Sequence, residues 1–198
     1  MLNKLRKRLD PFLTRLALAF VSRGFSPNSL SIIGFFVSIA AGIMYALSSH
    51  VSLSNYYFNT LIGGILLLIA GLFDILDGAV ARVTNQISNR GAFLDSLLDK
   101  VAEVVVFISI FLGNLSTPIW CLIAISLSLL VSYTRARADS LHIPLIGIGI
   151  GERAERLLII ALVGMIPLYG AMQVAVIMVS FVAGATIVQR INTAHKKL

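Results

Sequence analysis

The sequence predicts an all-α integral membrane protein with six transmembrane helices and an N-terminal juxtamembrane amphipathic helix. The first observation behind this prediction is composition, since 58% of the 198 residues are hydrophobic and the mean hydropathy is +0.92. The second is that apolar residues gather in six runs, each near the length of about 20 residues that crosses a bilayer as a helix. We expect spans at roughly residues 29–49, 58–82, 91–113, 117–138, 153–169 and 171–190.

Short connections join these runs, so we expect one membrane domain over residues 1–198, in which residues 29–190 form the six-helix bundle. The first 25 residues combine basic and apolar side chains, a pattern typical of a helix that lies on a membrane surface. Asp10 and Pro11 predict an N-cap and a first helical position, and Gly24 predicts the helix end. We expect no cleavable signal peptide, because no small-residue cleavage pattern follows the first long apolar run. The apolar residues at helical spacing are Leu9, Phe12, Leu13, Leu16 and Phe20.

The distribution of charge is the third observation, and it predicts the topology. All 16 Lys and Arg residues fall on one side of the six-span arrangement, whereas the loops around His50, Asn114 and Gly170 carry no formal charge. The positive-inside rule then places both termini in the cytoplasm of a multi-pass protein of the cell membrane. The net charge of +7 is spread along a membrane face, which favours anionic lipid head groups and phosphorylated substrates and excludes nucleic acid as a partner.

Four carboxylates interrupt the apolar sequence near the cytoplasmic ends of the second and third spans. Asp74 and Asp77 are spaced i,i+3, and Asp95 and Asp99 are spaced i,i+4, so each pair lies on one helix face. Acids at this depth are expensive and usually mark a functional site. Four of them in one cavity would repel one another without a cation, and carboxylate oxygens suit a hard cation such as Mg²⁺ or Mn²⁺. The single Cys121 excludes both an internal disulfide and a cysteine metal site.

Small residues stand between the acids. Gly78 follows Asp77 directly and leaves room for a ligand or a second helix, and Ala81 lies one turn further on. Arg82, at the end of the apolar run, is suited either to hold a phosphate or to anchor the helix at the interface.

The 26 residues from Asp74 to Asp99 resemble the signature of the CDP-alcohol phosphotransferase family, D-x2-D-G-x2-A-R-x8-G-x3-D-x3-D, without a departure. Members of that family transfer a phosphoalcohol group from a CDP-linked donor to a hydroxyl and release CMP. The resemblance implies a six-helix homodimer that uses Mg²⁺ or Mn²⁺, two ions in all, with Asp99 also acting as the general base. The implied metal ligands are Asp74, Asp77, Asp95 and Asp99. The implied donor contacts are Pro27, Asn28, Asp74, Asp77, Gly78, Ala81 and Arg82.

Two later segments, residues 132–139 and 151–157, resemble the branch of the family that uses inositol phosphate as acceptor. Arg153 and Arg156 are spaced i,i+3 on one helix face. Together with Arg135 or Arg137 they could grip the phosphate of a phosphorylated polyol through forked hydrogen bonds. The alternative for all four is ordinary anchoring of helix ends by positive charge. Glu103, one turn beyond Asp99, is expected either to support the site or to pair with a nearby Arg.

Several alternatives stay open at this point. The same chemistry could use glycerol phosphate or serine as acceptor, and the donor could be CDP-diacylglycerol or CDP-archaeol. An intramembrane prenyltransferase also uses Asp-rich helices, although its motifs do not usually carry the Gly-Ala-Arg pattern. A divalent-cation transporter would place its acids near the midplane on broken helices within a repeat, whereas here the acids lie near one edge and no repeat is evident.

Overall fold

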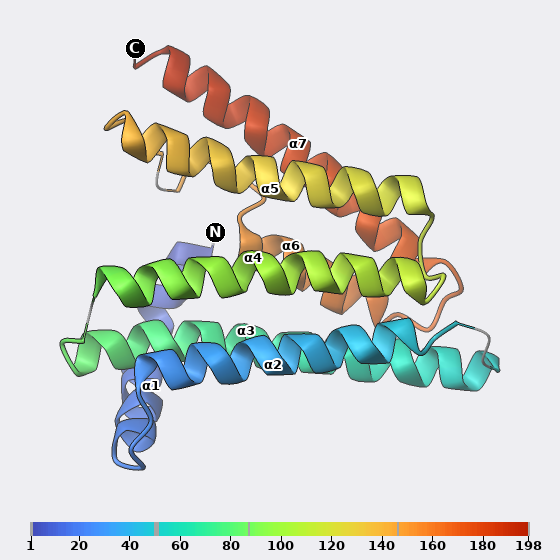
Figure 1. Cartoon of the computed structure of the whole chain (residues 1–198), viewed down its shortest axis with the longest axis horizontal. Helices are drawn as coiled ribbons and strands as arrows, with labels where there is room; N and C mark the ends of the chain where they lie inside the picture. The colour runs from blue at the N-terminus through green and yellow to red at the C-terminus, as the bar shows by residue number, and fades with distance from the viewer. Residues whose placement is uncertain (1, 50–51, 87, 146, 198) are drawn as a thin grey trace.

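The computed structural model describes residues 2–49, 52–86, 88–145 and 147–197, with side chains from residue 11 onward. These residues form seven α-helices and no strand, as the sequence predicts for the fold class (Figure 1). The helices are α1 (Leu2–Val21), α2 (Pro27–Ala46), α3 (Leu53–Val83), α4 (Asn89–Leu112), α5 (Pro118–Ser140), α6 (Arg153–Gly164) and α7 (Ala171–His195).

The helices pack in two groups with α4 between them. Helices α2 and α3 run side by side, α5 lies along α7, and α6 contacts both α3 and α7 (Figure 1). Helix α4 makes its close backbone contacts with α2 and α5. The largest buried apolar cluster joins all of α2 to α7, through residues such as Tyr45, Leu67, Phe107, Ile160 and Val176. This packing fixes the relative positions of the helices that carry the predicted site.

Four helices are long and apolar enough to cross a membrane, namely α2, α3, α5 and α7. Helix α4 is 24 residues long but carries five charged residues, Arg90, Asp95, Asp99, Lys100 and Glu103, in its first 15 positions. The expected span 153–169 is wrong in extent, because α6 ends at Gly164 after 12 residues, about 18 Å of helix. Pro167 disfavours helical backbone at the residue before it, and Gly170 has a positive φ of 87°, so the chain turns there.

The N-terminal segment also departs from the expected boundaries. Helix α1 begins at Leu2 and contains Pro11, so the predicted start at Asp10 is wrong; the side chain of Asp10 lies outside the described part. The helix ends before Gly24, whose φ of +84° is the left-handed conformation that glycine adopts readily. Ser26 then caps α2 through a reciprocal capping box with Ser29.

Helix α1 crosses one end of the bundle and docks on α3 (Figure 1). Its buried Leu13 and Ala17 pack with Leu30, Leu76 and Val80. Leu76 and Val80 flank Asp77 in sequence, so the docking of α1 supports the part of α3 that bears the acids.

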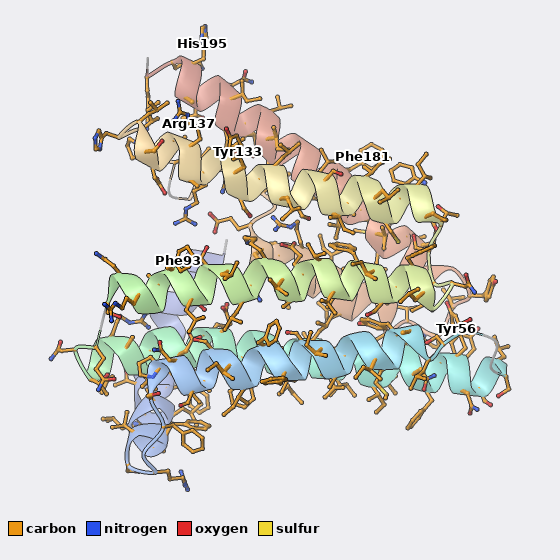
Figure 2. All side chains as sticks on the ribbon, viewed as in Figure 1. Tyr56, Phe93, Tyr133, Arg137, Phe181 and His195 are labelled. Carbon is orange, nitrogen blue, oxygen red and sulfur yellow. The ribbon has the colours of Figure 1, made fainter. Side chains whose placement is uncertain are left out.

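The two ends of the bundle differ in charge. Described residues of the two basic-end loops, 84–86 and 141–145, and the end of α7 lie at one end, where Figure 2 shows Arg137 and His195. Tyr56 marks the opposite end (Figure 2), whose connections at 47–52, 113–117 and 165–170 contain no Lys or Arg. The acids of α3 and α4 therefore lie toward the basic end, as the sequence predicts.

Candidate active site

Three of the four predicted acids meet where α3 faces α4. Carboxylate oxygens of Asp74, Asp95 and Asp99 all lie within 4.8 Å of one another. The i,i+4 spacing puts Asp95 and Asp99 on one face of α4, and close packing with α2, where Gly34 lies against Phe73 of α3, brings the two acidic helices near one another. These oxygens are a donor set that suits a hard divalent cation.

The fourth acid, Asp77, borders the same small cavity as the other three but points toward α2. It is 7% exposed, and its Oδ2 accepts a hydrogen bond of 2.6 Å from Ser31 Oγ. A hydroxyl bonded to one carboxylate oxygen holds the group in one orientation and leaves its other oxygen available. Ser31 is therefore a positioning residue that the motif does not include.

The residues expected to bind the donor nucleotide lie together beside Asp77. Pro27 and Asn28 at the start of α2 face Gly78 and Ala81 of α3 across a cavity of about 150 Å³. Gly91, which opens the second acidic segment, lines the same cavity, and a Cβ there would lie 3.2 Å from Asn28 Oδ1. Arg82 is exposed in the last turn of α3 and is not part of the cavity wall. The fold thus gathers the small residues of the motif but leaves Arg82 outside the cavity lining.

A larger polar cavity of about 540 Å³ lies between α4, α5, α6 and α7. Asp95 and Asp99 form the wall that it shares with the acidic cluster. Its lining contains five cationic residues, Lys100, Arg135, Arg153, Arg156 and Arg190, and four acidic ones, Asp95, Asp99, Asp139 and Glu152, so the cations are in excess by one. The cavity can therefore hold an anion directly beside the acids.

The four arginines predicted to bind the acceptor do not behave alike. Arg135 lines the polar cavity and is 4.0 Å from Asp139. Arg137, by contrast, borders a separate cavity with Leu141 and Ile191, so the structure does not bring it to the others. The reason is helical geometry, since residues two apart on α5 face different directions.

Arg153 and Arg156 share a face of α6, as expected, but have different partners. Arg153 Nη1 is 2.7 Å from Asp99 Oδ1 and 3.0 Å from Asp74 Oδ1. Arg156 is 1% exposed and forms a forked pair with Glu103 on α4, through Nε at 2.8 Å and Nη2 at 2.9 Å. Its Nη1 donates to the carbonyl of Gly151 at 2.6 Å. The alternative in which Glu103 pairs with a nearby Arg is therefore the one that the structure adopts.

Arg190 is a cavity residue that the sequence reasoning missed. It is 2% exposed on α7, donates to the carbonyls of Ile148 and Val131, and lies 3.7 Å from Glu152. In sequence it follows an apolar run and has the pattern of an interface anchor. Only its contacts with a loop about 40 residues earlier in the chain reveal its place in the cavity.

A further cavity of about 270 Å³ lies between α3 and α6. Leucine and isoleucine side chains form most of its wall, and Asp74 and Arg153 stand at its polar end. The acidic cluster is thus bordered by a small cavity toward α2, a cationic cavity toward α5 and α7, and an apolar cavity toward α6.

A helical membrane-type bundle with clustered carboxylates beside a cationic cavity is suited to an enzyme that handles polyanionic substrates. Residues 25–188 match the family model described as CDP-alcohol phosphatidyltransferase. The chain therefore belongs to the CDP-alcohol phosphatidyltransferase family and is a transferase.

The comparisons also identify the branch of the family. The chain is 34% identical to the archaetidylinositol phosphate synthase of Pyrococcus horikoshii over 200 residues, which cover 100% of this chain and 98% of the relative. It is 35% identical to that of Methanothermobacter thermautotrophicus over 197 residues, which cover 98% of this chain and 92% of the relative.

Solved structures of Mycobacterium tuberculosis phosphatidylinositol phosphate synthase share the fold. The complex with manganese and citrate has a TM-score of 0.75 at 26% identity, and covers 92% of this chain and 88% of that one. The CDP-DAG complex has a TM-score of 0.74 at 25% identity, with 92% of each chain covered. The resemblance to the inositol-phosphate branch that the sequence predicted is thereby confirmed.

Proposed function

We propose that this chain transfers a phosphatidyl-type group from a CDP-linked lipid to a hydroxyl of a phosphorylated polyol, inositol phosphate, and releases CMP. The acceptor oxygen forms a new bond to the lipid-linked phosphorus, the bond from that phosphorus to CMP breaks, and the hydroxyl proton passes to a base. The observation that carries this proposal is the cationic cavity directly beside the acidic cluster. Relatives named archaetidylinositol phosphate synthase and phosphatidylinositol phosphate synthase agree with this proposal.

The donor would lie over α2 and α3. Pro27, Asn28, Gly78 and Ala81 line the small cavity next to Asp77, which suits a nucleotide, and Arg82 lies outside its lining. The lipid would be CDP-diacylglycerol or CDP-archaeol, since the relatives include both phosphatidylinositol phosphate and archaetidylinositol phosphate synthases. A solved relative holds CDP-DAG.

We infer that the acids hold Mg²⁺ or Mn²⁺, two ions, through Asp74, Asp77, Asp95 and Asp99. The mutual approach of three carboxylates to within 4.8 Å supports this assignment, as does the manganese in a solved relative. When bound, such ions offset the charge of the pyrophosphate donor during phosphoryl transfer. Asp99 also lines the polar cavity, and this position suits it to accept the proton of an acceptor hydroxyl.

The acceptor phosphate would lie beside Arg135 and Arg153 in the polar cavity, whose wall also includes Arg190, held by the carbonyls of Ile148 and Val131. Arg156, which the sequence suggested as a phosphate ligand, would not contact the acceptor, because Glu103 and the carbonyl of Gly151 bind its guanidinium. Arg137 borders another cavity, so we no longer place it at the acceptor.

We further propose that all six expected segments are embedded in the cell membrane, with α4 and α6 packed against the four helices that are long and apolar enough to cross it. The active site and both termini would face the cytoplasm, because the basic loops lie at that end. Anionic membrane lipids would contact the basic end. The homodimer implied by the family stays a prediction.

The function is tested by CMP release from purified protein with CDP-diacylglycerol or CDP-archaeol. The acceptors are inositol phosphate, glycerol phosphate, serine and free inositol at equal concentration. We expect inositol phosphate to give the highest rate. Preference for serine or free inositol would contradict a phosphate-binding cavity, whereas preference for glycerol phosphate would keep the cavity and contradict the inositol assignment.

A further inference from the structure

Arg153 occupies a position that no other described residue shares. Its side chain borders the small acidic cavity, the cationic cavity and the apolar cavity between α3 and α6. It lies at the first position of α6, so its backbone is fixed while its long side chain can reach more than one of these spaces. A ligand that binds in one of these cavities can therefore change the position of the Arg153 side chain in another.

The contact of Arg153 with the acids uses the same carboxylates as the proposed cation site. Its Nη1 bridges Asp74 and Asp99 at 3.0 Å and 2.7 Å, and both acids belong to the group whose oxygens lie within 4.8 Å of one another. The guanidinium therefore supplies the positive charge that these carboxylates need. A divalent cation among the same oxygens would repel it at close range.

The way Arg153 is bound indicates that it can leave. Both ion pairs are made by one nitrogen, Nη1, while Nε is buried without a hydrogen-bond partner. Arg156, one turn further on, engages Nε, Nη1 and Nη2 and is 1% exposed. The side chain of Arg153 is 17% exposed toward the cavities. Arg156 is thus locked in place, whereas Arg153 has an unsatisfied donor and an open space beside it.

From these contacts we propose that Arg153 is an exchangeable counter-ion that couples the cation site to the acceptor cavity. Without a divalent cation it offsets part of the negative charge of Asp74 and Asp99. When a cation binds, the guanidinium is released from the acids and turns into the polar cavity, where it adds one positive charge beside Arg135 and Arg190. The cation then raises the affinity for a phosphorylated acceptor, and by linkage the acceptor raises the affinity for the cation equally. This inference rests on the proposed function.

The first test measures Mn²⁺ binding to the purified full-length chain without any substrate, by the loss of the free-ion paramagnetic resonance signal. Arg153→Gln removes the competing charge and should tighten Mn²⁺ binding by about tenfold or more. Arg153→Lys keeps a charge but has a shorter reach and no fork, so its affinity should fall between those of Arg153→Gln and wild type. Arg135→Gln is the matched control, because it removes one positive charge from the same cavity without touching the acids. Equal effects of Arg153→Gln and Arg135→Gln would overturn the exchange.

The second test measures the dissociation constant of inositol phosphate with and without Mn²⁺, by calorimetry. In wild type, Mn²⁺ should tighten binding by a factor within the usual range of about 5 to 150. In Arg153→Gln this coupling should disappear, whereas Arg135→Gln should bind the anion more weakly and keep the coupling. Persistence of the coupling in Arg153→Gln, or its absence in wild type, would overturn the inference and leave the proposed function intact. Failure of wild type to bind Mn²⁺ at all would overturn both.

Discussion

The acidic and the basic sides of the site are built in different ways. The acids come from two helices that follow one another in the chain, within 26 residues, and their spacing alone sets which face they share. The cations of the polar cavity come from α4, α5, α6 and α7. Two of them, Arg156 and Arg190, bind protein groups from other segments. The four carboxylates of the motif therefore border one small cavity, whereas Arg156 and Arg190 are held by protein groups and Arg135 and Arg153 are more open to the polar cavity.

The largest effect should come from the acidic side. Asp74→Asn, Asp77→Asn and Asp95→Asn should each reduce CMP release to background, because an amide removes the charge that holds a divalent cation. Excess EDTA should do the same to wild type, and added Mg²⁺ or Mn²⁺ should restore the rate. Full activity in EDTA would contradict the metal assignment. The acids would then have no shared role that distinguishes them from the arginines of the polar cavity.

Asp99 should differ from the other acids in what it changes. Asp99→Asn keeps the shape of the side chain but cannot accept the hydroxyl proton, so kcat should fall about 10²- to 10⁴-fold. The KM for the CDP-linked donor should change little. Steady-state kinetics with each substrate varied in turn provides the measurement. A collapse of donor binding with normal turnover at saturation would make Asp99 a binding residue instead of the base.

On the basic side, breaking the pair of Glu103 and Arg156 should affect stability. Both side chains are at most 2% exposed, and removing one partner from a buried pair costs about 3–5 kcal/mol. Glu103→Gln should therefore markedly lower the apparent Tm in detergent. The apparent Tm is the temperature at which half of the protein is lost from solution on heating. The combined replacement Glu103→Leu with Arg156→Met should be less harmful than Glu103→Gln, because it leaves no buried charge unpaired at positions 103 and 156, and the half-buried Lys100 loses only a contact of 4.0 Å. Unchanged Tm in Glu103→Gln would show that Arg156 is available to bind substrate.

The smallest effect should separate two arginines on α5. Arg135→Lys keeps the charge in the polar cavity but loses the fork, so the acceptor KM should rise about tenfold, with the donor KM nearly unchanged. Arg137→Lys is the matched control and should leave both constants unchanged, because Arg137 borders a different cavity. A larger change in acceptor KM for Arg137→Lys than for Arg135→Lys would reverse our placement of the acceptor.

Sequence reasoning went furthest where the signal is local. The spacing of the acids and the end of α1 before Gly24 depend on residues within a few positions, and the structure contains both. Helix limits were less secure. Pro11 lies inside α1 although it favours a first helical position, and α6 ends at Gly164, five residues before the expected end of its apolar run. Hydropathy reports how apolar a run is, not where its backbone turns.

By itself, the sequence determined the helical membrane-type fold, the grouping of basic residues at one end, the family and the position of the acidic motif. The fold class and the charge distribution follow from composition and periodicity, and the family follows from the resemblance of residues 74–99 to its signature. Only the tertiary structure decided which arginines can reach a ligand. Arg153 and Arg156 have the same helical face and nearly the same position in the sequence, yet one meets Asp74 and Asp99 and the other meets Glu103. The physical reason is that the partner of a charged side chain is chosen by the packing of helices distant in sequence, and no local pattern records that packing.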